Sequence, residues 1–266
     1  MSLPYDVNCS MLFTELPLLE RPAAARAAGF EAIELWWPFA AAVPSDGEVD
    51  RLVAAIRDAG VALVGLNFAA GDMPGGDRGL VSWPGREREF RDNVEVVAGI
   101  GERLGCRALN ALYGNRVEGA DPAAQDELAR ENLAFAARAA ARVGGTVLVE
   151  PVSGAERYPI KTTADAAAVI DRVGEPNVAL LMDLYHLAVN GDDLDQAIAS
   201  YTDRTRHVQI ADAPGRGEPG TGTLDLDRYL VALEREGYAG WVGLEYKPTV
   251  PSAESFGWLA TGRTTR

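Results

Sequence analysis

The sequence TVLVEP, from Thr146 to Pro151, is the clearest signal of a buried strand that ends in a charged residue. Its apolar residues Val147, Leu148 and Val149 are typical of a short strand buried within a sheet. Pro151 keeps Glu150 extended and ends the strand. A carboxylate at the end of a buried strand is costly unless a partner neutralises it. We therefore expect Glu150 to share a divalent metal ion with residues from later strands.

Segments with the pattern of a strand and of a helix alternate along the whole sequence. The predicted strands cover residues 5–10, 31–36, 61–67, 106–112, 146–150, 178–183, 205–211 and 241–246. The predicted helices cover residues 17–28, 46–59, 86–104, 121–143, 163–173, 194–200, 225–236 and 252–262. Such alternation implies a parallel sheet. Eight strand–helix units in 266 residues match a closed (β/α)8 TIM barrel better than an open sheet.

Two further features of the chain agree with a barrel. The loop after the first predicted strand has no GxGxxG motif, which disfavours a dinucleotide-binding sheet. No linker or change of composition divides the chain. The sequence therefore predicts an α/β fold with one domain over residues 1–266.

Composition limits the partners of this protein. The net charge of -14 disfavours nucleic acid and anionic membrane, because both are bound by basic surfaces. Neither a signal peptide nor a run of about 18 apolar residues is recognisable, so we expect a soluble cytoplasmic protein. The charge does not indicate whether the chain forms homo-oligomers. Cys9 and Cys106 lack zinc-site spacing and are expected to be small buried hydrophobic residues.

Polar residues stand at or near the ends of four consecutive predicted strands. They are Glu150, Asp183, Gln209 and Glu245. Active sites of barrels lie at the carboxyl ends of the strands. Strand parity places Glu150, Gln209 and Glu245 opposite bulky apolar residues that would face the helices. We therefore expect these side chains to converge at the mouth of the barrel.

Three carboxylates at one mouth would repel one another. At a separation of about 4 Å and an effective dielectric constant near 20, each pair costs roughly 4 kcal/mol. Shared protons or a cation must relieve this repulsion. Three carboxylates and one amide are hard oxygen donors, which favour Mg²⁺ or Mn²⁺ over zinc or copper.

Other polar residues near the predicted mouth are candidates for substrate binding. His186 follows Asp183 in the sequence DLYH, and Arg216 projects from the glycine-rich loop DAPGRGEPGTG. Lys247 follows Glu245, and arginine or lysine in this position suits a substrate carboxylate. Asn67 ends the third predicted strand and could reach the same place. His207 lies nearer the entry of its strand, where a packing role is favoured. Packing is also expected for Trp36, Trp37 and Phe39, and these aromatic residues could in addition form a wall of the pocket.

Several long motifs of the chain resemble those of hydroxypyruvate isomerases, within the xylose isomerase-like barrel superfamily. They are NCSMLFTELPLLERPAAARAAGFEAIEL, GDRGLVSWPGREREFRDNV, VEPVS, MDLYH, HVQIADAPGRGEPGTG and GWVGLEYKP. The resemblance runs nearly from end to end. It implies a metal site at Glu150, Asp183, Gln209 and Glu245, in which Glu150 and Glu245 are the catalytic pair. It also implies substrate contacts from His186 and Arg216.

The reaction expected from this resemblance is the metal-dependent conversion of hydroxypyruvate into tartronate semialdehyde through an enediolate. Arg216, together with Lys247, would then hold the carboxylate of a small hydroxy-keto acid. A 2-oxo-tetronate isomerase, a keto-sugar 3-epimerase and an inosose-type dehydratase on the same barrel are alternatives. A sugar-acid binding protein without turnover is an alternative of another class, and the intact pair of glutamates argues against it.

Overall fold

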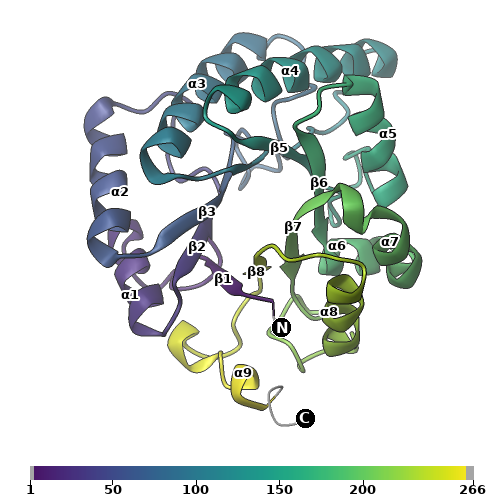
Figure 1. Ribbon diagram of the computed structural model, residues 1–266. Helices are drawn as coiled ribbons and strands as arrows, with labels where there is room; N and C mark the ends of the chain where they lie inside the picture. The colour runs from purple at the N-terminus through teal and green to yellow at the C-terminus, as the bar shows by residue number, and fades with distance from the viewer. Residues whose placement is uncertain (1–2, 262–266) are drawn as a thin grey trace.

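The computed structural model describes residues 3–261, and within them eight parallel strands form one closed barrel in sequence order (Figure 1). Each strand pairs with the next one along the chain, and β1 pairs with β8 to close the ring. This confirms the predicted TIM barrel. The strands are β1 (Tyr5–Asn8), β2 (Ala32–Leu35), β3 (Ala62–Asn67), β4 (Ala108–Asn110), β5 (Thr146–Val149), β6 (Val178–Asp183), β7 (Thr205–Ile210) and β8 (Val242–Leu244).

Helices surround the ring of strands (Figure 1). The α-helices are α1 (Arg21–Ala27), α2 (Asp46–Ala59), α3 (Glu87–Leu104), α4 (Pro122–Arg142), α5 (Thr163–Val173), α6 (Leu184–Asn190), α7 (Leu194–Tyr201), α8 (Leu226–Arg235) and α9 (Trp258–Thr261). Short 3-10 helices are η1 (Leu18–Glu20), η2 (Thr202–Arg204) and η3 (Ser252–Glu254). Within residues 3–261, no helix is both long and apolar enough to cross a membrane.

Local sequence explains where the helices begin and which face they bury. Ser45 and Glu48 form a capping box at the start of α2, and Thr162 and Asp165 form one at the start of α5. Each box satisfies backbone N–H groups that have no partner inside the helix. The predicted apolar face of α2 is buried, and it consists of Val49, Leu52, Val53 and Ile56.

Two helical predictions were wrong in detail. The sequence pattern did not reveal α6, which follows β6 without a connecting loop. It forms because Asp183, the last residue of β6, accepts hydrogen bonds from the backbone N–H groups of Tyr185 and His186. The helix predicted over residues 252–262 is broken between η3 and α9, where Ser255 donates a hydrogen bond to the carbonyl of Ser252. Its predicted end at Gly262 lies outside the described residues.

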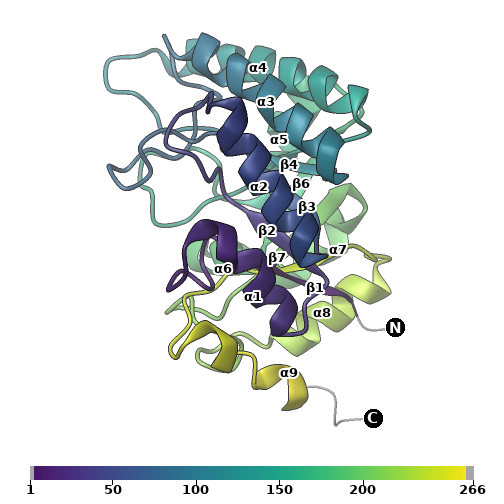
Figure 2. The same cartoon turned by 90° about the vertical axis from the view of Figure 1, so that its left-hand side faces the viewer.

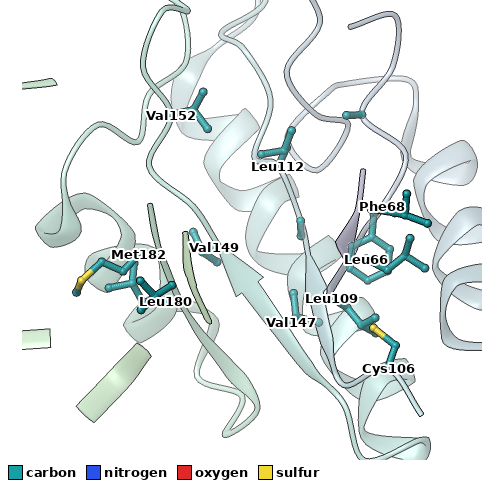
Figure 3. Close-up of a cluster of buried hydrophobic side chains, with 14 of the residues drawn as sticks. Leu66, Phe68, Cys106, Leu109, Leu112, Val147, Val149, Val152, Leu180 and Met182 are labelled. Carbon is teal, nitrogen blue, oxygen red and sulfur yellow. The ribbon is translucent and has the colours of Figure 1, made fainter. Parts of the chain in front are cut away.

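Alternate residues of each strand face the helices, and these residues form most of the core. Figure 3 shows the region around β3 to β6, where Leu66, Leu109, Val147 and Leu180 come from neighbouring strands. The opposite face of β5 points into the barrel, where Leu148 packs with Ala179, Leu181 and Ala108. The predicted parity of β5 is therefore confirmed. Cys9 and Cys106 are buried free thiols.

The barrel interior is polar around β1, β2 and β7. Asp6, Glu34 and His207 are buried together, and each offers a ligand atom within 4.8 Å of the others. His207 Nε2 lies 2.6 Å from Glu34 Oε2. Burial alone would lower the pKa of His207, but the Glu34 carboxylate outweighs it and raises the pKa to about 9. His207 is thus a buried, paired residue of the interior, in agreement with its predicted structural role.

Two interior glycines give Glu34 its space. A Cβ atom at Gly243 would lie 2.7 Å from Glu34 Oε1, and one at Gly65 would lie 3.0 Å from Glu34 Cβ. Glu34 cannot easily move aside, because its carboxylate accepts hydrogen bonds from Asn8 and Gln209 and pairs with His207. Gly243 in β8 therefore leaves the space that the buried carboxylate of Glu34 occupies.

We predict that Gly243→Ala destabilises the protein by about 1–3 kcal/mol, because the new methyl group forces Glu34 away from its hydrogen-bond partners. Urea unfolding measures this loss. Gly99→Ala in α3 is the control, because a Cβ there has no neighbour within 4 Å and alanine favours a helix. Equal stability of the Gly243→Ala variant and the parent protein would contradict this role of the glycine.

Candidate active site

Side chains from three strand ends and one helix meet at the mouth of the barrel. Glu150 follows β5, Asp183 ends β6, His186 lies in α6 and Glu245 follows β8. Each offers a ligand atom within 4.8 Å of the others, and all four are buried. The structure therefore brings together three of the four predicted metal ligands, with His186 beside them.

Gln209, the fourth predicted ligand, lies next to Asp183 in the register of β6 and β7. Its amide nitrogen donates a hydrogen bond of 2.8 Å to Glu34 Oε1. Since an ionised carboxylate only accepts hydrogen bonds, Glu34 fixes the amide with its nitrogen toward the interior. Gln209 Oε1 consequently has no hydrogen-bond partner within the described part of the chain, although it is buried.

A second buried oxygen has no hydrogen-bond partner within residues 3–261. Asp183 Oδ1 accepts the N–H groups at the start of α6, whereas Asp183 Oδ2 accepts none. Buried polar atoms are normally satisfied, so two unpartnered oxygens beside two carboxylates need an explanation. A hard divalent cation fits these residues, because Glu150, Asp183, Gln209 and Glu245 supply only oxygen ligands.

Glu150 and Glu245 are held by neutral donors from other strands. Asn110 in β4 donates a hydrogen bond of 2.7 Å to Glu150 Oε2. Asn8 in β1 and the indole N–H of Trp36 donate to Glu245 Oε1, at 2.9 Å and 2.6 Å. These contacts fix the direction of both carboxylates, and no residue between 3 and 261 donates a hydrogen bond to Glu150 Oε1.

The pKa values of both glutamates are raised. Burial, followed by the charges of Glu245 and Asp183, raises the pKa of Glu150 well above its ordinary value. Burial also raises the pKa of Glu245 to about 8, although the Arg216 guanidinium acts in the opposite direction. A carboxyl group whose pKa is raised from its ordinary value takes up and returns a proton more readily near neutral pH, as general acid–base chemistry requires.

His186 is held in one tautomer. The backbone N–H of Ser153 donates to His186 Nδ1 at 3.1 Å, so this nitrogen carries a lone pair and the hydrogen lies on Nε2. Nε2 lies 3.5 Å from Asp183 Oδ2 and 3.8 Å from Glu150 Oε1, too far for a hydrogen bond. Burial lowers the pKa of His186 to about 4, so the ring is neutral at pH 7. His186 therefore offers an N–H donor to the site rather than a lone pair for a metal ion.

Arg216 is bound to the carboxylates of the site. Its guanidinium forms an ion pair with Glu245 Oε2, donates to the Glu245 carbonyl at 3.3 Å and lies 3.8 Å from Asp183 Oδ2. It also lies over the ring of Tyr185, at 5.2 Å from the centroid. The positive charge of Arg216 is therefore already engaged by Glu245.

A cavity of about 1080 Å³ opens above the cluster. Its walls include Asn67, Glu150, His186, Arg216, Glu245 and Lys247, so six of the eight predicted site residues line it. Asp183 and Gln209 are buried and do not line it. Figure 2 shows long connections, in blue and teal, gathered at one side of the barrel, away from the N-terminus.

The sequence prediction missed several residues that hold the site. Asn8 and Asn110 end β1 and β4, and Glu34 lies in β2. The search for polar residues at strand ends was applied only to the last four predicted strands. The same search in the first four strands would have found both asparagines. Trp36 was expected to pack or to line the pocket, and it does line the cavity, but its hydrogen bond to Glu245 was not foreseen.

Nitrogen NMR of the protein labelled at its two histidines tests these assignments. At pH 7 we expect both ring nitrogens of His207 to carry hydrogen, and only Nε2 of His186. His186 should stay neutral down to about pH 4, and His207 charged up to about pH 9. A His186→Asn variant assigns the signals. A hydrogen on His186 Nδ1 would contradict the contact with Ser153.

Comparison with known proteins identifies the family of this chain. A family model described as "Xylose isomerase-like TIM barrel" matches residues 22–261. A Streptomyces coelicolor protein provisionally named hydroxypyruvate isomerase is 59% identical, with 97% of this chain and 96% of that protein covered. The Escherichia coli hydroxypyruvate isomerase is 32% identical, with 97% and 98% covered.

A solved structure with the description "AP endonuclease, family 2", from Brucella melitensis, has a TM-score of 0.89. It is 36% identical and covers 98% of this chain and 99% of its own. Both the fold and the sequence are thus shared over nearly the full length. The chain belongs to the hydroxypyruvate isomerase family of the xylose isomerase-like TIM barrels.

Proposed function

We propose that this chain is a metal-dependent isomerase that converts hydroxypyruvate, or a closely related hydroxy-keto acid, into its aldehyde isomer. The observation that carries this proposal is the pair Glu150 and Glu245, buried at the barrel mouth with ligand atoms within 4.8 Å of each other. The names of the relatives from Streptomyces coelicolor and Escherichia coli support the reaction type. The same pair argues against a binding protein without turnover.

The metal ion would be Mg²⁺ or Mn²⁺, held by Glu150, Asp183, Gln209 and Glu245. The unpartnered oxygens of Asp183 and Gln209 support this ligand set. When bound, the ion would act as a Lewis acid that stabilises negative charge on neighbouring substrate oxygens. It would also reduce the repulsion among the three carboxylates, which Arg216 alone offsets only in part.

The two glutamates would move the protons of the reaction. One glutamate removes a proton from C3 of hydroxypyruvate, and the electron pair forms the C2–C3 double bond of an enediolate. The second glutamate, or the first one again, delivers a proton to C2. The hydrogen of the C3 hydroxyl passes to the oxygen on C2, which leaves an aldehyde at C3. Raised pKa values suit both carboxyl groups to this exchange.

Neutral and charged donors around the pair would stabilise the enediolate. His186 would donate its Nε2 hydrogen to a substrate oxygen, since its tautomer directs this hydrogen toward the site. Arg216 would contact the same region while it holds Glu245 in place. Asn67 and Lys247, which line the cavity, would make further substrate contacts.

A 2-oxo-tetronate isomerase is a second candidate, and the cavity volume favours it. Pockets for drug-sized ligands occupy about 300–1000 Å³, and the volume of about 1080 Å³ exceeds what a three-carbon acid needs. Both reactions would use the same glutamates. Turnover of the two acids side by side distinguishes them.

We predict that Glu150→Gln and Glu245→Gln each lower kcat for hydroxypyruvate by at least about 1000-fold, because an amide cannot take up the proton. Production of tartronate semialdehyde in the presence of Mn²⁺ is the measurement. Circular dichroism should show an intact fold. Glu95→Gln, on the exposed surface of α3, is the control and should keep full activity. Retention of the parent rate by either site variant would refute the assignment.

Metal binding should depend on pH. Glu245 has a pKa of about 8 in the metal-free protein, and a carboxyl group must lose its proton to bind a metal ion. The affinity for Mn²⁺ should therefore rise by about tenfold or more per pH unit between pH 6 and 8, because the pKa of the second proposed glutamate ligand, Glu150, is raised as well. Calorimetric titration in buffers of different ionisation enthalpy measures both affinity and proton release. EDTA should abolish turnover, and added Mn²⁺ or Mg²⁺ should restore it.

An affinity for Mn²⁺ that stays constant between pH 6 and 8 would contradict a site built on Glu245. Turnover that survives complete removal of metal would contradict the metal requirement itself. The Glu245→Gln variant serves as the reference, because it lacks one of the two glutamate carboxyl groups with a raised pKa and should bind Mn²⁺ more weakly and with a smaller dependence on pH.

A further inference from the structure

The connection between β3 and α3 carries two arginines that line the cavity, Arg78 and Arg86. They differ in their partners. Arg86 is paired with Glu89 through two hydrogen bonds of 2.7 Å and lies 3.4 Å from Asp77 Oδ2. Its charge is therefore neutralised by acidic neighbours.

Arg78 has no carboxylate within 4.0 Å among residues 3–261. Its Nη1 group donates to two backbone carbonyls, those of Met73 at 3.0 Å and Asp77 at 2.6 Å. These bonds fix the guanidinium but do not neutralise it. The hydrogens on Nε and Nη2 have no acceptor in the described part of the chain. Arg78 is therefore a half-buried cation in the wall of the cavity, held in place by backbone carbonyls and without a carboxylate partner.

The backbone next to Arg78 is held rigidly. Gly79 has a φ of +116°, and a Cβ atom there would lie 1.9 Å from the carbonyl oxygen of Leu112. The N–H of Gly79 donates to the carbonyl of Ala70, and the N–H of Ser82 donates to that of Tyr113. The loop is thus packed tightly against the segment after β4, and Arg78 is positioned before any ligand arrives.

Arg78 faces the same cavity as the proposed catalytic residues. Its charge is one of those that lower the pKa of His186, after burial and the charges of Arg216 and Lys161. Arg216 is closer to the carboxylates but is engaged by Glu245. Lys247, also at the wall, has an exposed side chain without an ion-pair partner within residues 3–261.

We propose that Arg78 is the residue that binds the carboxylate of the substrate, and that Lys247, which lines the same cavity after β8, assists it. The substrate would place its hydroxy-carbonyl end at Glu150 and Glu245 and its carboxylate at the β3–α3 connection. A guanidinium with two unused N–H donors suits a carboxylate. This inference rests on the proposed function for the chemistry of the substrate, and it moves the carboxylate from Arg216, where the sequence placed it, to Arg78.

The test compares Arg78→Met with the parent protein, with Mn²⁺ present. For hydroxypyruvate, KM should rise by about 10- to 100-fold while kcat changes little, because the lost contact is to a part of the substrate that does not react. Dihydroxyacetone, which has a hydroxymethyl group in place of the carboxylate, should bind the variant and the parent equally weakly. Arg78→Lys should recover part of the loss. Arg88→Met, on the exposed surface of α3, is the control.

Binding of glycerate, an unreactive acid of similar size, separates this inference from the proposed function. Loss of glycerate binding in Arg78→Met supports the subsite even if the parent protein does not isomerise hydroxypyruvate. Equal glycerate affinity of variant and parent overturns the subsite, whatever the activity. Loss confined to dihydroxyacetone phosphate, with carboxylates unaffected, would assign the site to a phosphate ester and overturn the carboxylate assignment.

Discussion

Repulsion among the buried carboxylates of Glu150, Asp183 and Glu245 is the constraint on which the site depends. Three such charges cannot stay ionised together without compensation. The metal-free protein relieves the repulsion through raised pKa values of Glu150 and Glu245 and through the guanidinium of Arg216. The same features suit the pair to the cation and the proton transfer of the proposed function. The repulsion among these carboxylates therefore affects both the stability of the fold and the proposed proton transfer.

A second polar layer beneath the mouth gives this site its precision. Glu34 accepts hydrogen bonds from Asn8 and Gln209, while Asn8 also donates to Glu245. One buried carboxylate thus sets the orientation of the Gln209 amide and, through Asn8, contributes to holding the Glu245 carboxylate. Gly65 and Gly243 make the space for it. The interior of the barrel is in this way a support for the site, and its polar residues are held by several partners each.

The cavity separates two tasks that arginine could perform. Arg216 lies against the carboxylates and stabilises them, whereas Arg78 is fixed by backbone carbonyls and keeps its charge for a ligand. A substrate with an anionic end and a reacting end would then be held at two points. Binding at two points would orient the substrate, and it would do so without placing a second guanidinium beside the reacting carbons.

The barrel and the inward-facing residues of β5, β7 and β8 could be predicted from the sequence, because alternation along the chain and parity within strands are local properties. The segment TVLVEP predicted a buried strand and placed the Glu150 carboxylate at its carboxyl end, which is the end at the mouth of a barrel. Tertiary contacts set three features that the sequence did not show. They are the orientation of the Gln209 amide, the tautomer of His186 and the different partners of Arg78 and Arg216. Glu34 and Gln209, for example, are separated by 175 residues and meet only when the barrel closes. Hydrogen bonds of this kind depend on atoms that the chain brings together in space, so no local pattern reveals them.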